Sequence, residues 1–167
     1  GYLALRGTVG ESRLAACVAD PGLSSLLGPM RKMLTQFPPE ALANPLKADP
    51  NIFSPFMAQI ESSFAQRWKV VQRGFWVHGV RSLPEYLDAA RRFTIEESLQ
   101  AIRCPVFLGW AEEDPLSVTA PELQQSLSTR NSLVRFHAVE GAGDHCEMNG
   151  RSLLHQRMFD WLDETLA

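Results

Sequence analysis

The chain contains three short segments rich in apolar residues, at 13–20, 105–110 and 133–139, and each ends at a polar or glycine- and proline-rich stretch. Apolar runs of this length are typical of strands buried on both faces of a parallel sheet. Apolar residues at helical spacing follow the second and third segments, over 120–128 and 152–166. Strands that alternate with helices predict an α/β fold with a doubly wound, mostly parallel sheet.

Residues 24–100 have a different pattern. Apolar residues recur there three or four positions apart, as at Ile60, Phe64 and Trp68. Prolines and glycines, including the proline pair at 38–39, divide the stretch into short helices. A helical block between two strand signals is typical of an insertion, or lid, in an α/β fold.

The first residues are helical in pattern from the start of the chain. Residues 2–8 have no N-cap before them, and Gly10 ends the stretch. Because no initiator Met precedes them, we expect that this sequence continues a longer protein. The expected parts are a first helix with a core strand, a helical lid and a C-terminal α/β core, at 1–23, 24–100 and 101–167.

Composition excludes several classes of protein. Hydrophobic residues make up 45% of the chain, charged residues 21%, and the net charge is −3. Lys and Arg form no run, which argues against a nucleic-acid or membrane-surface partner. No apolar stretch approaches the roughly 20 residues that cross a bilayer. Three cysteines without paired spacing argue against disulfides and a zinc site and favour a reducing, cytoplasmic location; they are Cys17, Cys104 and Cys146.

Titratable residues follow two of the predicted strands. The loop at 111–117 contains Asp114, and the glycine-rich loop at 140–150 contains His145. In an open parallel sheet, functional groups gather beyond the carboxyl ends of the strands. An acid that orients a histidine, which in turn takes a proton from a hydroxyl, needs one carboxylate and one imidazole. We therefore predict Asp114 as the catalytic acid and His145 as the base.

Each prediction has a structural alternative. Asp114 precedes Pro115 and would also suit a turn, and Glu113 and Glu112 compete as the acid. His145 would also suit a loop histidine that bonds to backbone. The glycines at 141–143 favour catalysis, because closely spaced glycines let a loop bring a side chain into a crowded site.

The neighbouring polar residues are expected to have structural roles. His137 falls inside a predicted strand, and His155 is expected at the surface of the last helix. Ser117 suits a helix cap. Cys146 is adjacent to His145, but neighbouring side chains on an extended loop point apart, which favours packing over a Cys–His pair.

Three segments of the sequence resemble segments of the α/β-hydrolases. Residues 102–114 resemble their acid strand, and 136–146 and 159–163 resemble their histidine loop and final helix. The Gly-Ala-Gly-x-His-Cys variant resembles a branch containing pseudooxynicotine-type C–C hydrolases, fungal polyketide-shortening hydrolases and acylaminoacyl-peptidase-like proteins. Residues 75–87 resemble the lid of the same branch.

The resemblance implies a Ser–Asp–His triad in chain order, with the acid and the base present here. Gly1 resembles the last glycine of the Gly-x-Ser-x-Gly-Gly nucleophile elbow, which places the serine upstream. The implied partners are an N-terminal half that contains the serine and the oxyanion hole, and a small-molecule substrate; a homodimer is a further option. The implied chemistry is hydrolysis of an ester or a C–C bond without a cofactor or metal, and this segment alone is expected to be inactive.

Three residues of the lid are candidates for lining the substrate pocket. His78 lies beside aromatic residues, among them Trp76 and Phe75. The alternative for His78 is a packed histidine at a helix end. The alternatives for the whole chain are a peptidase-like acyl-peptide hydrolase and a non-catalytic binding protein on a degenerate hydrolase scaffold.

Overall fold

The computed structural model describes all of residues 1–167, which form two compact units. The first unit combines Gly1–Met33 with Thr94–Ala167, and the second is Leu34–Phe93. The second unit is therefore inserted in sequence between the two segments of the first.

The first unit is built around a three-stranded parallel sheet. Its strands are β1 (Cys17–Ala19), β2 (Val106–Ala111) and β3 (Asn131–Phe136), in the order β1-β2-β3. Cys17 pairs with Val106 across the first ladder, and β3 is paired with β2 along its whole length. The predicted parallel α/β architecture is confirmed, although β1 is shorter than expected and β3 ends earlier.

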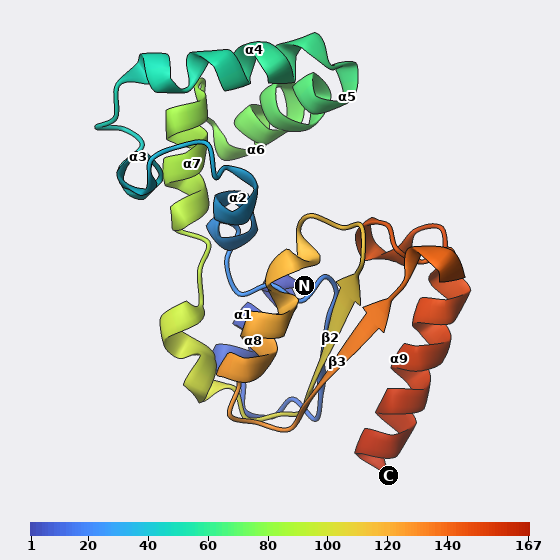
Figure 1. The fold of residues 1–167 in the computed structure, drawn as a ribbon. Helices are drawn as coiled ribbons and strands as arrows, with labels where there is room; N and C mark the ends of the chain where they lie inside the picture. Colours follow the sequence, from blue (N-terminus) through green and yellow to red (C-terminus); the bar gives the residue numbers. More distant parts are fainter. The chain divides into compact units, whose positions relative to one another are not determined.

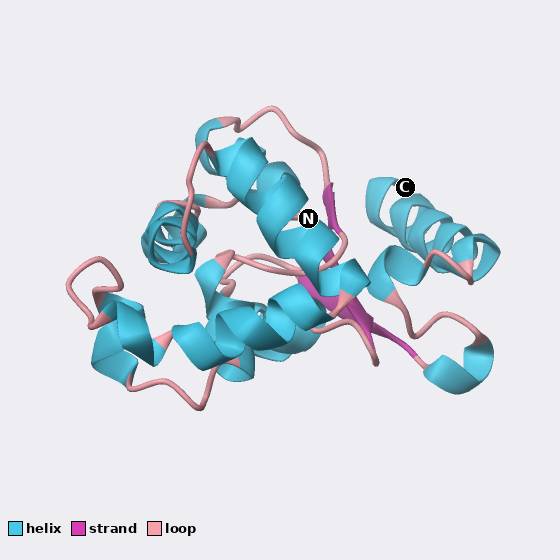
Figure 2. Ribbon diagram, turned by 90° about the horizontal axis from the view of Figure 1, so that it is seen from above, coloured by secondary structure: helices cyan, strands magenta, loops and turns pink.

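Helices cover both faces of this sheet. Figure 1 shows α9 on one face and α1 and α8 on the other, and Figure 2 places the C-terminal helix, marked C, to one side of the magenta strands. The helices of this unit, 3-10 turns included, are α1 (Tyr2–Gly10), α2 (Leu27–Met33), η3 (Glu96–Ala101), η4 (Ser117–Thr119), α8 (Ala120–Ser126), η5 (Ala138–Glu140), η6 (His145–Glu147) and α9 (Arg151–Leu166).

The face beneath α9 holds an apolar cluster. Phe107 and Phe136 are fully buried there, with Leu154 and Trp161 of α9 packed against them. The Phe107 and Trp161 rings meet edge to face with centroids 5.7 Å apart. Leu166, the last residue of α9, is largely exposed.

The opposite face packs against α1 and α8. Leu5 of α1, Leu108 of β2 and Ala120 of α8 are fully buried. Gly22 follows β1, and a Cβ at this position would lie 3.2 Å from the Cβ atoms of both Leu108 and Ala120. The chain that follows β1 therefore passes close to both the strand β2 and the helix α8. Strands buried on both faces account for the nearly continuous apolar sequence of β2.

The second unit is entirely helical. It contains α3 (Pro39–Ala43), η1 (Pro50–Ile52), α4 (Ser54–Ser62), α5 (Phe64–Gln66), a π-helical stretch η2 (Arg67–Phe75), α6 (Trp76–His78) and α7 (Leu83–Arg91). Phe37 packs against Phe53 and Phe56, with ring centroids 5.1 and 5.6 Å apart. A cavity of about 510 Å³ within this unit is lined by Phe53, Met57 and Phe75 among others.

The two ends of the insertion are joined within the first unit. Ser25 and Thr94 form an isolated antiparallel bridge, and the Ile95 N–H donates to the Ser24 carbonyl over 3.0 Å. The segments that lead into and out of residues 34–93 are thus fixed side by side. None of the helices combines the length and the apolar character that a bilayer crossing needs.

Candidate functional site

Asp114 and His145 meet at the carboxyl ends of β2 and β3. The His145 Nδ1 and Asp114 Oδ2 atoms are 2.9 Å apart. The Asp114 side chain is 1% exposed, whereas the His145 side chain is 56% exposed. Because an ionised carboxylate only accepts hydrogen bonds, Nδ1 carries the proton and Nε2 is left as the basic atom. The arrangement fits an acid that orients a base whose ring remains accessible.

The loop after β2 fixes the acid. Asp114 Oδ1 accepts a hydrogen bond from the Leu116 N–H over 3.0 Å, so both carboxylate oxygens are engaged. The sequence suggested that Ser117 caps a helix, but in the structure it does not. Its buried hydroxyl donates to the carbonyls of Ala111 and Asp114 over 2.8 and 3.0 Å. Buried hydroxyl groups are almost always hydrogen-bonded, and these two carbonyls are the partners of Ser117. The two bonds stabilise the turn that contains Asp114.

The loop after β3 is packed closely against its surroundings. Gly143 accepts a hydrogen bond from the Glu113 N–H over 2.8 Å, which ties the histidine loop to the acid loop. A Cβ at Gly143 would lie 2.8 Å from the Ala138 Cα, and Gly141 has a φ of 74°. Gly143 thus allows close approach of two backbones, and Gly141 supplies a left-handed turn.

We expect Gly143→Ala to impair the site. The added methyl group would collide with the Ala138 backbone, so the loop would shift and move His145 away from Asp114. The hydrolysis that the sequence resemblance implies should slow by on the order of 10- to 100-fold, since displacements near 1 Å have such effects. The control is Gly7→Ala in α1, where a Cβ would meet nothing within 4 Å. Steady-state kinetics of both variants test this, and equal activities would contradict the steric argument.

Cys146 faces the histidine ring, contrary to the prediction from sequence. Its Sγ lies 3.6 Å from His145 Nε2, because Cys146 adopts a left-handed backbone conformation with a φ of 54° and not an extended one. Burial raises the pKa of the thiol to about 11, and the nearby carboxylates Asp20, Asp114 and Glu147 act in the same direction. The thiol therefore stays protonated at neutral pH and is a poor nucleophile.

Two further carboxyl groups border the pair and were not predicted. Asp20 follows β1, and Glu147 follows the His145-Cys146 turn with a φ of 47°. Glu147 is fully buried. The sequence carried a signal for Asp20, since it is the first polar residue after the strand β1. Left-handed conformations at non-glycine residues cost about 1–3 kcal/mol each and cluster at functional sites. Glu147 had no sequence signal, because its inward direction depends on this turn.

The other acidic and histidine residues that the sequence analysis considered lie away from the contact between Asp114 and His145. Glu112 forms an ion pair with Arg135 and accepts the Ala138 N–H, a contact that lowers the pKa of its carboxyl group. His137 lies just after β3 and not within it, with Nδ1 3.6 Å from a Glu112 oxygen. His155 is exposed on α9. None of these residues touches the Asp114–His145 contact.

The three lid candidates have different surroundings within the second unit. His78 packs edge-on against the rings of Tyr86 and Phe93, with centroids 5.2 and 5.3 Å apart. Phe75 is buried and lines the cavity of that unit, whereas Trp76 is 81% exposed. Contact between any of them and a substrate stays a prediction.

Three curated fungal proteins are similar to this chain over nearly its whole length. "Hydrolase acrC" of Aspergillus aculeatus is 26% identical over 98% of the chain, and "Hydrolase LUC6" of a Fusarium species is 26% identical over all of it. The "20-hydroxy-prefusarin hydrolase FUS2" of Gibberella moniliformis is 24% identical over 100% of the chain. These similarities support a hydrolase.

The chain spans only part of these relatives. It covers 40% of the length of acrC and 41% of each of the other two. No family model matches the chain.

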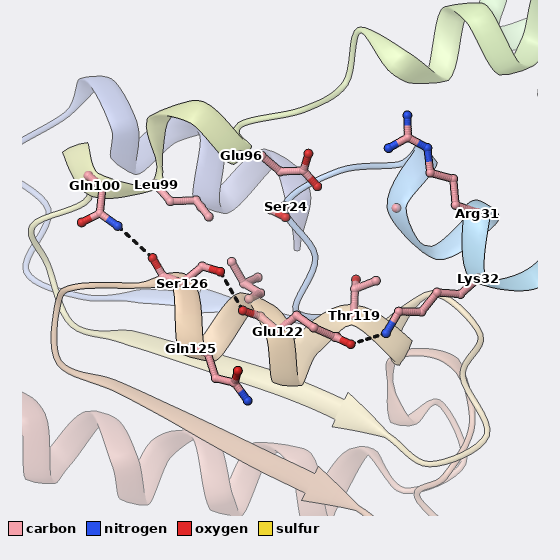
Figure 3. Close-up of a pocket in the computed structure, with 12 residues that line it drawn as sticks. Ser24, Arg31, Lys32, Glu96, Leu99, Gln100, Thr119, Glu122, Gln125 and Ser126 are labelled. Atoms are coloured by element: carbon pink, nitrogen blue, oxygen red, sulfur yellow. Dashed lines mark hydrogen bonds and ion pairs between the residues drawn. The ribbon is translucent and has the colours of Figure 1, made fainter. Parts of the chain in front are cut away.

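A separate cavity in the first unit does not involve the acid or the histidine. It has a volume of about 720 Å³ and lies along α8, next to α2 and η3 (Figure 3). Figure 3 shows Lys32 reaching the Glu122 carboxylate and Gln100 bonded to the Ser126 carbonyl. Lys32 and Glu122 therefore pair across the cavity, and its lining includes neither Asp114 nor His145. No group of three or more His, Cys, Asp or Glu residues is arranged to hold a metal ion.

Proposed function

We propose that this chain is the C-terminal part of a serine-type α/β-hydrolase whose nucleophilic serine lies upstream. The observation that carries the proposal is the 2.9 Å contact between His145 Nδ1 and the buried Asp114 carboxylate. Acid and base follow successive strands of a parallel sheet, as the triad order of this fold requires. The similarity to three named hydrolases supports the same assignment.

In the proposed mechanism, the upstream serine Oγ attacks the substrate carbonyl carbon while His145 Nε2 takes its proton. Asp114 keeps the imidazole oriented and stabilises the imidazolium that forms. The imidazolium then protonates the leaving group, which is an alkoxide for an ester or a carbanion for a cleaved C–C bond. His145 next activates water, which attacks the acyl-enzyme and releases the acid. An oxyanion hole in the upstream half would stabilise the developing negative charge.

The proposed substrate is a medium-sized apolar ketone or ester, cleaved at a C–C or ester bond. One relative is named as the hydrolase of 20-hydroxy-prefusarin, which supports a polyketide-like substrate for this chain as well. Residues 24–100 are proposed to act as the lid that shapes the substrate pocket, with Phe75, Trp76 and His78 as candidate lining residues. No organic cofactor or metal takes part in the proposed mechanism.

The proposal is tested by labelling the full-length polypeptide with a fluorophosphonate probe, which reacts with activated serines. We expect covalent labelling upstream of residue 1 that is lost in His145→Ala. The 167-residue segment alone should neither label nor hydrolyse p-nitrophenyl butyrate, because acid and base without a nucleophile give little catalysis. A folded full-length protein that does not label, or label on a serine of this segment, would contradict the proposal.

A further inference from the structure

Glu147 is buried in an unusual position for a charged residue. Its side chain is fully inaccessible, and neither carboxylate oxygen has a hydrogen-bond donor among the other groups of the chain. Asp20 Oδ1 is likewise buried without a donor. Unpartnered carboxylates are rarely buried, because an ion without a donor is strongly destabilised in the interior. The two groups therefore need a donor that the other side chains and the backbone of residues 1–167 do not supply.

Glu147 and Asp20 are neighbours in space, because the Sγ of Cys146, which precedes Glu147, lies 4.0 Å from the Asp20 carbonyl oxygen. The two carboxyl groups also shift each other's pKa through a side-chain hydrogen bond. Two ionised carboxylates have no proton to share and would repel. A single proton between them satisfies both groups at once, with protonated Glu147 as the donor and Asp20 as the acceptor. Burial raises the pKa of Glu147 to about 9, and the contact with Asp20 adds to the effect. Burial also raises the pKa of Asp20.

The sheet is shaped to accept this pair. Asp20 follows β1 and lies against Gly109 in the neighbouring strand β2, where a Cβ would come 2.5 Å from Asp20 Oδ1. A glycine in the middle of a buried strand therefore provides the space for the carboxyl group. From the other side, the left-handed conformations of Cys146 and Glu147 turn the Glu147 side chain inward. Two independent features of the backbone thus bring the carboxyl groups together.

We propose that Glu147 and Asp20 share one proton and that this pair is a positioning device, which anchors the turn of His145 to the end of β1. Glu147 is separated from His145 by one residue, so its attachment to the sheet restrains the histidine next to Asp114. The shared proton does not depend on the proposed hydrolase function, whereas the effect on His145 during hydrolysis rests on it.

The charged surroundings favour retention of this proton. Asp114 and Asp144 are negative neighbours that oppose ionisation of Glu147. The opposing influence acts on Asp20 and comes from His145. The remaining titratable neighbour is the Cys146 thiol, which is neutral because burial raises its pKa to about 11. The negative charges next to Glu147 therefore act in the same direction as its burial.

The pH dependence of stability follows from the raised pKa. The folded protein keeps a proton on Glu147 that an ordinary carboxyl group, with a pKa of 4.5, has already lost in the unfolded chain. The resulting stabilisation is full below pH 4.5 and is lost progressively as pH rises to about 9. Glu147→Gln keeps a donor for Asp20 at every pH and should remove this loss.

The test measures thermal unfolding of the full-length polypeptide between pH 5 and pH 9, with fluorophosphonate labelling rates at the same pH values. We expect the melting temperature of Glu147→Gln to rise relative to the native protein as pH increases. The matched control is Glu164→Gln, an exposed carboxylate on α9, which should leave the native pH profile unchanged. Parallel profiles of the native protein and Glu147→Gln would overturn the shared proton.

The positioning role has its own readout. Glu147→Ala removes the anchor and should slow labelling by about tenfold or more, in line with small displacements of catalytic groups. Glu147→Gln should retain labelling at pH 6–7 and lose less of it at pH 9 than the native protein. Equal losses in Glu147→Gln and Glu147→Ala at pH 6–7 would overturn the positioning role. If the native protein does not label at all, the hydrolase proposal fails, while the unfolding profiles still decide whether the proton is shared.

Discussion

Replacing His145 with alanine in the full-length protein should lower kcat for ester hydrolysis by on the order of 10⁴–10⁶-fold. In the proposed mechanism, Nε2 of His145 takes the serine proton, and no second histidine touches the Asp114 contact. Asp114→Asn should lower kcat by on the order of 10⁴-fold, because the amide would favour the wrong imidazole tautomer while its volume is unchanged. Steady-state rates with p-nitrophenyl butyrate measure both effects.

The control for these variants is His155→Ala, which removes an exposed histidine of α9 and should leave kcat within about twofold of the native value, as is usual for surface sites. Folding is checked by comparing melting temperatures across the set. If His145→Ala retained more than a hundredth of the native activity while His155→Ala matched it, another group would have to act as the base.

The largest effect on stability is expected for Phe107→Ala. Phe107 is fully buried in β2 and packs edge-on against Trp161 of α9, so its loss leaves a cavity between the sheet and the helix. The free energy of unfolding should fall by about 3–5 kcal/mol, the usual range for buried Phe→Ala changes. Urea unfolding of the full-length protein measures it. Val139→Ala is the control, because Val139 is 93% exposed and should change stability by less than about 0.5 kcal/mol.

Much of the first unit follows from its apolar pattern. The segments around Val106 and Leu133 are strands, and the last helix begins at Arg151, one residue before the expected start. The strand β2 was predictable because its burial on both faces leaves little freedom in which residues are apolar. The strand β3 was also expected to be buried on both faces, but it is only partly buried, because it lies at the edge of the three-stranded sheet. The strand β1 is shorter than its apolar run, because its pairing with β2 extends only from Cys17 to Ala19. Sequence alone does not state how far a partner strand extends.

The site was predictable only in part. Asp114 and His145 were identified because each follows a strand, and the structure brings them together. The inward turn at Cys146 and Glu147 was missed, because left-handed conformations at residues other than glycine have no clear sequence signal. The π-helical stretch Arg67–Phe75 was equally unpredictable, since its residues satisfy ordinary helical spacing.

The bridge between Ser25 and Thr94 has an evolutionary consequence. Because the Ser25–Thr94 bridge lies within the first unit, residues 34–93 leave and re-enter that unit at adjacent points. Insertions whose ends lie close together are tolerated without disturbing the host unit. On the proposed function, substrate preference can therefore diverge within residues 34–93 while Asp114 and His145 are retained.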